Sequence, residues 1–207
     1  MTKVVVALLL AIAVAAPAGA QPAVPAESLT PPQKGDRPDA RPAEDERRAA
    51  RLDVMFGRLA ATTDERRANR IARHIMRRMA QSGSDTVDFL MTRAALRMRA
   101  KEYGQALDLL DGVIRLEPEF AEGWNRRATV HFLAGNLGQS IADIEQVLQR
   151  EPRHFGALAG LAMILRAMDR KPEALAVMDR ALTIHPHLPR MRERRDRLRL
   201  ELEGSEL

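Results

Sequence analysis

Histidines are the residues of this chain whose type and spacing come nearest to a metal site. His185 and His187 flank Pro186 in an H-x-H pattern, and His154 lies further upstream in a similar setting. Metal ligation needs three or four converging donors, and only two of these histidines are adjacent. We interpret them as loop histidines and predict that the protein holds no metal and no other cofactor.

No group of residues typical of an active site occurs in the sequence. The chain has no cysteine, and it lacks the G-x-S-x-G, H-E-x-x-H and phosphate-binding glycine motifs. After the first twenty residues its serines all lie in a predicted tether, turn, small packing position or tail: Ser28, Ser82, Ser84, Ser140 and Ser205. We predict that the protein is not an enzyme. The alternative is a hidden acid/base pair, which would need a pocket that excludes water.

Arginines on one helical face are a stronger candidate for binding. Residues 47–99 hold 13 arginines against 5 aspartates and glutamates. The face itself consists of Arg66, Arg70, Arg73 and Arg77, with Arg67 and Arg78 beside it. Such a face could contact anionic lipid headgroups or an acidic partner. We prefer to interpret it as the solvated back of an amphipathic helix, and keep binding to an anionic surface as the alternative function.

The overall charge does not indicate a nucleic-acid partner. The formal net charge is +5, and it falls to +4 without Lys3. With no cysteine, both a lipoprotein anchor and stabilisation by disulfides are excluded. Only 3% of the residues are aromatic, whereas alanine and leucine abound, which favours close helix packing over a β-sandwich.

The first residues resemble an export signal. Lys3 precedes an apolar run over 4–16, and Ala18-Gly19-Ala20 fits a signal-peptidase site. The run would reach only about 20 Å as a helix, too short for a membrane span. We predict a signal peptide over 1–20, cleaved after Ala20, and a periplasmic or secreted protein. Residues 21–43 hold six prolines and are predicted to form a disordered tether.

Helical patterns begin after this segment. Residues 44–84 carry two apolar stripes at helical spacing, separated by Thr63-Asp64, and predict an antiparallel hairpin. A 34-residue period follows, marked by Pro118, Pro152 and Pro186. Two columns of small residues share the period: Ala94, Ala128 and Ala162, then Ala106, Ser140 and Ala174. Each period predicts two helices that cross closely at the small residues and end before the proline. Such units stack side by side as a solenoid.

The repeats resemble the tetratricopeptide repeat family over residues 87–188. The middle unit carries the family's tryptophan, small residue, turn glycine and terminal proline, which are Trp124, Ala128, Gly138 and Pro152. It also resembles the variant that pairs an arginine, Arg127, with an aspartate, Asp143. The resemblance implies an all-α fold, a right-handed α-solenoid of antiparallel helix pairs. The predicted units are 87–120, 121–154 and 155–188, followed by a capping helix over 189–203.

The resemblance extends beyond the three regular units. Ala60 and Ala72 keep the family's small-residue offsets, so the hairpin over 44–84 resembles a degenerate repeat. As a whole, the chain resembles small exported repeat proteins of alphaproteobacteria.

In this family the first helix of each unit lines a concave groove that holds a peptide or helix. By register, the groove residues of this chain are Met91, Ala95, Met98, Asn125, Thr129, Phe132, Ala159, Met163 and Arg166. For some of them, Phe132 especially, packing between units is the alternative. The family's carboxylate clamp is not matched, because Met91 and Ala95 stand where a lysine and an asparagine are needed. We predict a protein- or peptide-binding scaffold or assembly factor of the cell envelope; neither the partner nor the oligomeric state is indicated.

Overall fold

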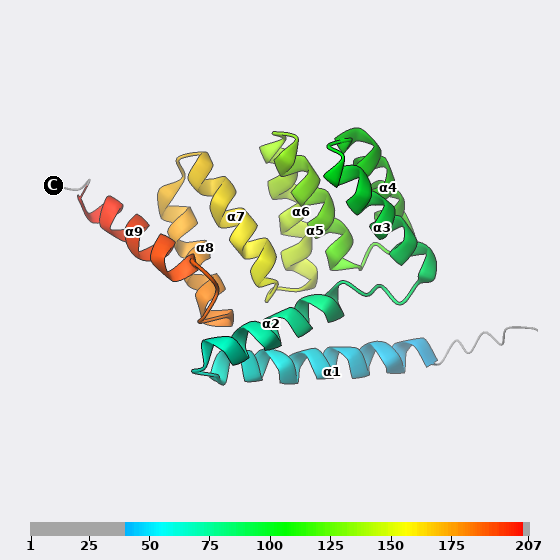
Figure 1. Ribbon diagram of the computed structural model, residues 1–207, viewed down its shortest axis with the longest axis horizontal. Coiled ribbons are helices and arrows are strands. Elements are labelled where there is room, and N and C mark those ends of the chain that lie inside the picture. The colour runs from blue at the N-terminus through cyan, green and yellow to red at the C-terminus, as the bar shows by residue number, and fades with distance from the viewer. Residues whose placement is uncertain (1–39, 205–207) are drawn as a thin grey trace, which may run out of the picture. The chain divides into compact units, whose positions relative to one another are not determined.

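The computed structural model describes residues 40–204, with side chains from Glu46 onward. The predicted signal peptide, and the predicted tether up to residue 39, lie outside this range. Within it the chain forms helices and no strand, which confirms the all-α prediction (Figure 1). None of the helices in 40–204 is long and apolar enough to cross a membrane.

Nine helices follow one another along the described residues. They are α1 (Ala40–Ala61), α2 (Glu65–Met79), α3 (Asp85–Arg99), α4 (Tyr103–Leu116), α5 (Ala121–Leu133), α6 (Leu137–Arg150), α7 (Phe155–Ala167), α8 (Lys171–Ile184) and α9 (Met191–Gly204). Helix α1 includes residues 40–43, which the sequence assigned to the tether. Pro42 does not prevent this, because the first N–H groups of a helix have no partner within it.

Helices α3 to α8 form three antiparallel pairs, α3–α4, α5–α6 and α7–α8, which stack in chain order (Figure 1). The small columns lie where paired helices cross, and their members are at most 2% exposed: Ala94, Ala106, Ala128, Ser140, Ala162 and Ala174. Ser140 is tolerated there because its hydroxyl donates a 2.8 Å hydrogen bond to the carbonyl of Ala128. The chain is therefore an α-solenoid of helix pairs.

The turn inside each pair repeats one backbone conformation. Lys101, Gly135 and Asp169 are 34 residues apart and have φ values of 61°, 82° and 59°. The next residue's N–H then bonds back to the first helix, as from Asn136 to the carbonyl of His131 at 2.9 Å. This arrangement closes the end of the helix, and glycine adopts it most readily.

The middle pair carries an ion-pair network that joins it to the first pair. Arg127 donates to both carboxylate oxygens of Asp143, at 2.9 and 2.6 Å, which confirms the expected pairing. It also donates to Asp111 of α4 at 2.6 Å. The guanidinium groups of Arg127 and Arg150 each lie over the ring of Trp124, 4.9 Å from its centroid.

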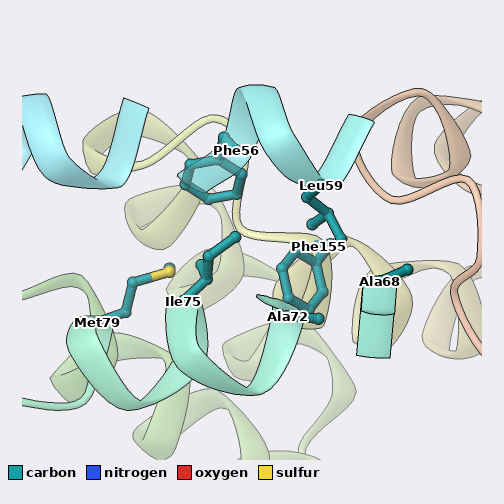
Figure 2. Packing of buried hydrophobic residues seen from close by; sticks show 7 residues of the cluster. All are labelled: Phe56, Leu59, Ala68, Ala72, Ile75, Met79 and Phe155. Carbon is teal, nitrogen blue, oxygen red and sulfur yellow. The ribbon is translucent and has the colours of Figure 1, made fainter. Parts of the chain in front are cut away.

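The N-terminal hairpin packs differently from a further repeat. Helices α1 and α2 share a buried cluster with the start of α7 (Figure 2), whose members are Phe56, Leu59, Ala68, Ala72, Ile75, Met79 and Phe155. Ile184 at the end of α8 and Leu188 border this cluster. Helix α2 has no extensive contact with α3, whereas α4 packs along α5.

The physical reason for this difference lies in the two faces of the hairpin. A stacked repeat needs a small residue where its helices cross, but Ala60 is exposed, unlike Ala72. Each helix has one apolar stripe and an arginine-rich opposite face, so the pair can bury only one surface. That surface is covered at the loop end of the repeats, where Arg153 also lies over the ring of Phe56 at 4.3 Å and bonds Asp53 at 2.7 Å.

Helix α9 covers the C-terminal end of the array, next to α8. Met191 and Leu198 are buried against the α7–α8 core. Arg195 and Arg199 on the same helix pair with Asp179 of α8 at 2.9 and 3.2 Å.

Candidate functional site

A pocket of about 210 Å³ lies between α5 and α7, the first helices of the second and third pairs. Its lining includes five of the nine groove residues predicted from the sequence: Asn125, Thr129, Phe132, Ala159 and Met163. Thr129 and Met163 are exposed, Met163 by 43%. Apolar walls with two polar side chains at one edge suit an apolar segment that must also be oriented.

A glycine on α7, Gly160, adds open space to this hollow. Gly156 and Gly160 lie one turn apart on α7 and line the pocket. A Cβ at Gly160 would have only one contact, to Cδ1 of Ile144 at 3.8 Å, so its absence leaves open space. The sequence reasoning missed both glycines, although their four-residue spacing puts them on the same helix face as Met163.

The polar edge of the pocket is held in place by α5 itself. The side-chain amide of Asn125 donates to Glu122 at 2.9 Å, and the hydroxyl of Thr129 donates to the carbonyl of Asn125 at 2.9 Å. With its N–H group committed to Glu122, Asn125 retains its amide oxygen as an acceptor for a peptide N–H.

A second depression, of about 420 Å³, lies along α3. Met91, Ala95 and Leu96 line it together with Arg99 and Arg126. Leu96 is 50% exposed, and the sequence reasoning did not select it. The depression continues the predicted groove along the first helix of the first pair.

The remaining two predicted groove residues have other contacts. Met98 packs against the α3–α4 core rather than lining either hollow. Arg166 pairs with Glu201 of the last helix at 3.3 Å. The side chains of the candidate site therefore come from Met91, Ala95 and the α5–α7 pocket.

A buried histidine–glutamate pair is the group in the described interior that most resembles an acid/base pair. His154 is fully buried and Glu122 is 3% exposed, with Nε2 of His154 3.3 Å from a Glu122 oxygen. Nδ1 of His154 accepts the N–H of Ala157 at 3.0 Å, so Nε2 carries the proton. Burial raises the pKa of Glu122, but the hydrogen bond from His154 and the charge of Arg126 outweigh it, so the pKa lies below its ordinary value. Both groups are committed to joining the second and third pairs.

The two histidines of the H-x-H pattern each make a different structural contact. His185 is buried edge-on against the ring of Phe155, with centroids 5.3 Å apart. His187 donates from Nε2 to the carbonyl of Thr62 at 3.1 Å, which ties the loop to the hairpin. Within residues 40–204, no three His, Asp or Glu side chains lie together as metal ligands would.

The arginine face of α2 is exposed along its length. Arg66, Arg70, Arg73 and Arg77 are all exposed, and no described acidic side chain forms a salt bridge with them. Arg73 and Arg77 line a separate hollow beside Phe155 and His185. The face is thus physically accessible to an anionic partner.

Comparison with known proteins identifies the family. A family model described as tetratricopeptide repeat matches residues 131–193, and another with the same description matches residues 91–143. A TPR repeat-containing protein of Rhizobium etli, an alphaproteobacterium, is 44% identical over 136 residues, which are 66% of this chain and 67% of the relative. The chain therefore belongs to the tetratricopeptide repeat (TPR) family, as the 34-residue pattern predicted.

Solved structures share the fold at low sequence identity. The first TPR domain of Spaghetti (RPAP3), bound to an HSP90 peptide, has a TM-score of 0.55 at 15% identity and covers 58% of this chain and 95% of that one. The TPR2B domain of yeast Sti1 in complex with an Hsp70 peptide has a TM-score of 0.52 at 20% identity. The match covers 59% of this chain and 99% of that one. The Yersinia enterocolitica type III secretion chaperone SycD, in complex with a peptide of the translocator YopD, has a TM-score of 0.51 at 16% identity. The match covers 58% of this chain and 92% of that one.

Proposed function

We propose that this protein binds a segment of another protein in the groove formed by α3, α5 and α7, and that it acts as a scaffold or assembly factor without catalysis. The observation that carries the proposal is the pocket between α5 and α7, which opens beside Asn125, Thr129 and Met163. Similar folds are solved with peptides of HSP90, Hsp70 and a translocator bound. The export signal predicted over 1–20 makes the cell envelope the proposed location.

The side chains of the groove suggest an apolar or amphipathic segment. Met91, Leu96, Phe132 and Met163 offer apolar contacts, and methionine adapts readily to the shape of a partner. The polar edge at Asn125 would fix the direction of the bound backbone. No lysine takes the place of the family's carboxylate clamp, so a peptide held by its C-terminal carboxylate fits this groove poorly.

A crosslinking pull-down from native cells tests this proposal. The bait proteins are the wild-type chain, Met163→Glu and Met168→Glu. Met163 lines the pocket, whereas Met168 at the end of α7 is exposed to the same extent, 44%, outside it. A charge at 163 should remove the captured partner, and the same charge at 168 should retain it. Identical capture by all three baits would show that the groove is the wrong site.

Binding to an anionic surface is the second candidate function. It is favoured by the exposed row of Arg66, Arg70, Arg73 and Arg77, which has no described acidic partner. Changing Arg70, Arg73 and Arg77 to glutamine should then abolish binding to anionic liposomes. Rising ionic strength should also release the protein, whereas groove binding should be insensitive to salt. Unchanged liposome binding by the triple variant would discard this function.

A further inference from the structure

A pocket outside the groove concentrates arginine side chains. It has a volume of about 490 Å³ and lies between α1 and the connection from α2 to α3. Four arginines line it, Arg47, Arg48, Arg51 and Arg78, against one carboxylate, that of Asp88. We call it the α1 arginine pocket. It shares no residue with the hollows along α3, α5 and α7 except Asp88.

One arginine has a structural role in this pocket. Arg48 donates to the backbone carbonyls of Arg78, at 3.0 Å, and of Gln81. These carbonyls lie at the C-terminal end of α2, where a cation is favourable. Arg48 therefore holds α1 against the end of α2 and fixes the position of the pocket wall.

The other three arginines form no salt bridge among the side chains that the structure describes. Arg47, Arg51 and Arg78 are exposed, and no described carboxylate forms a salt bridge with them. Arg47 and Arg51 are one helical turn apart, a spacing at which like charges repel. Asp88 forms no salt bridge with them; its Oδ1 instead accepts from the backbone N–H and hydroxyl of Ser82, at 3.1 and 2.7 Å, and it is one negative charge among four arginines of the lining.

The chemistry of the pocket indicates the ligand. Guanidinium groups bind phosphate oxygens through paired, charge-assisted hydrogen bonds, and a bound anion would relieve the repulsion between them. Leu52 and Met55 are half-buried in the same wall and provide apolar contact for carbon atoms attached to the phosphate. We propose that the α1 arginine pocket binds a phosphate group, carried either by a small phosphorylated molecule or by a lipid headgroup. This site is independent of the groove.

Calorimetric titration of the full chain with inorganic pyrophosphate at constant ionic strength tests the proposal. The pocket variant carries Arg47→Gln, Arg51→Gln and Arg78→Gln and keeps Arg48. The matched control variant loses the same charge at exposed arginines outside the pocket, through Arg93→Gln, Arg115→Gln and Arg197→Gln. Pyrophosphate should bind the wild type and the control alike, and bind the pocket variant about tenfold or more weakly.

Vesicles of equal parts phosphatidylglycerol and phosphatidylcholine distinguish the two sources of phosphate. If vesicles compete with pyrophosphate for the wild type, the pocket takes a lipid headgroup; if they do not, it takes a small phosphorylated molecule. Circular dichroism melting confirms that each variant is folded. Failure of the folded wild type to bind pyrophosphate, or an equal loss in both variants, would overturn the proposal.

Discussion

At the residue scale, Arg127 shows how buried charge stabilises the array. Its guanidinium holds the carboxylates of Asp143 and Asp111. The hydrogen bond to Asp143 is the main cause that raises the pKa of Arg127 above its ordinary value, so the side chain stays charged. Asp143 is 5% exposed and Asp111 is 45% exposed, so the two carboxylates depend on Arg127 to different extents.

This difference predicts unequal effects of two substitutions. Arg127→Met should lower the free energy of unfolding by about 3–5 kcal/mol, because it leaves the charge of Asp143 buried without its partner. Asp111→Asn should lower it by about 1 kcal/mol or less, because that pair is exposed to solvent. Urea denaturation measures both, and equal losses would contradict the account.

His185 should make the stability of the protein depend on pH. Burial is the main cause that lowers the pKa of His185 from 6.5 to about 4, and the charge of His187 contributes to this shift. In the unfolded chain the pKa returns to about 6.5, so between these values the unfolded state binds more protons. The free energy of unfolding should therefore fall as the pH drops from about 6.5 to about 4, by up to about 3 kcal/mol.

Two glutamine variants test this prediction by urea denaturation at neutral and mildly acidic pH. The His185→Gln variant should lose much less stability on acidification than the wild type does, because a glutamine side chain does not titrate. His74→Gln is the control, since His74 is exposed on α2 and should behave like the wild type. Identical pH profiles for all three proteins would show that His185 is not the cause.

At the element scale, the distance between neighbouring helices decides which glycines are required. A Cβ at Gly123 of α5 would lie 2.8 Å from Cγ1 of Val113, and Val113 is fully buried on α4. Val113 cannot turn away, because its β-branched side chain is confined by the core. At Gly138 of α6 nothing lies within 4 Å of the same position.

Two glycine-to-alanine substitutions should therefore act in opposite directions. Gly123→Ala should destabilise the protein by about 1–3 kcal/mol through overpacking. Gly138→Ala should stabilise it by about 0.5–1 kcal/mol, because alanine restricts the unfolded chain and favours the helix. Thermal melting followed by circular dichroism compares them, and a shift of the same sign for both would contradict the assignment of the α4–α5 contact.

Local features of the elements were predictable from the sequence. The 34-residue period located the helix pairs, because close crossing restricts Ala94, Ala128 and Ala162 to small size. The Arg127–Asp143 pair followed from the family resemblance. Hollows were harder to foresee, since Gly160 contributes to one by lacking a side chain. Only the position of α7 next to α5 shows that no other group fills that space.

At the scale of the whole molecule, the placement of the hairpin was not predictable. The offsets of Ala60 and Ala72 suggested a stacked repeat, but docking depends on Phe155 and Arg153, about a hundred residues away along the chain. Contacts inside the hairpin, from Arg48 to the carbonyls of Arg78 and Gln81, place α1 at the end of α2 beside the α1 arginine pocket. Sequence periodicity reports the surface of one helix, whereas these sites depend on which surfaces meet.

The central claim is that the groove between α5 and α7 receives a segment of another protein. Photo-crosslinking in living cells tests it most directly, with a photoreactive residue placed in turn at Thr129, Met163 and Met168. The account predicts that positions 129 and 163 crosslink to the same apolar or amphipathic segment of one partner, and that position 168 does not. The same products at all three positions, or none at 129 and 163, would contradict it.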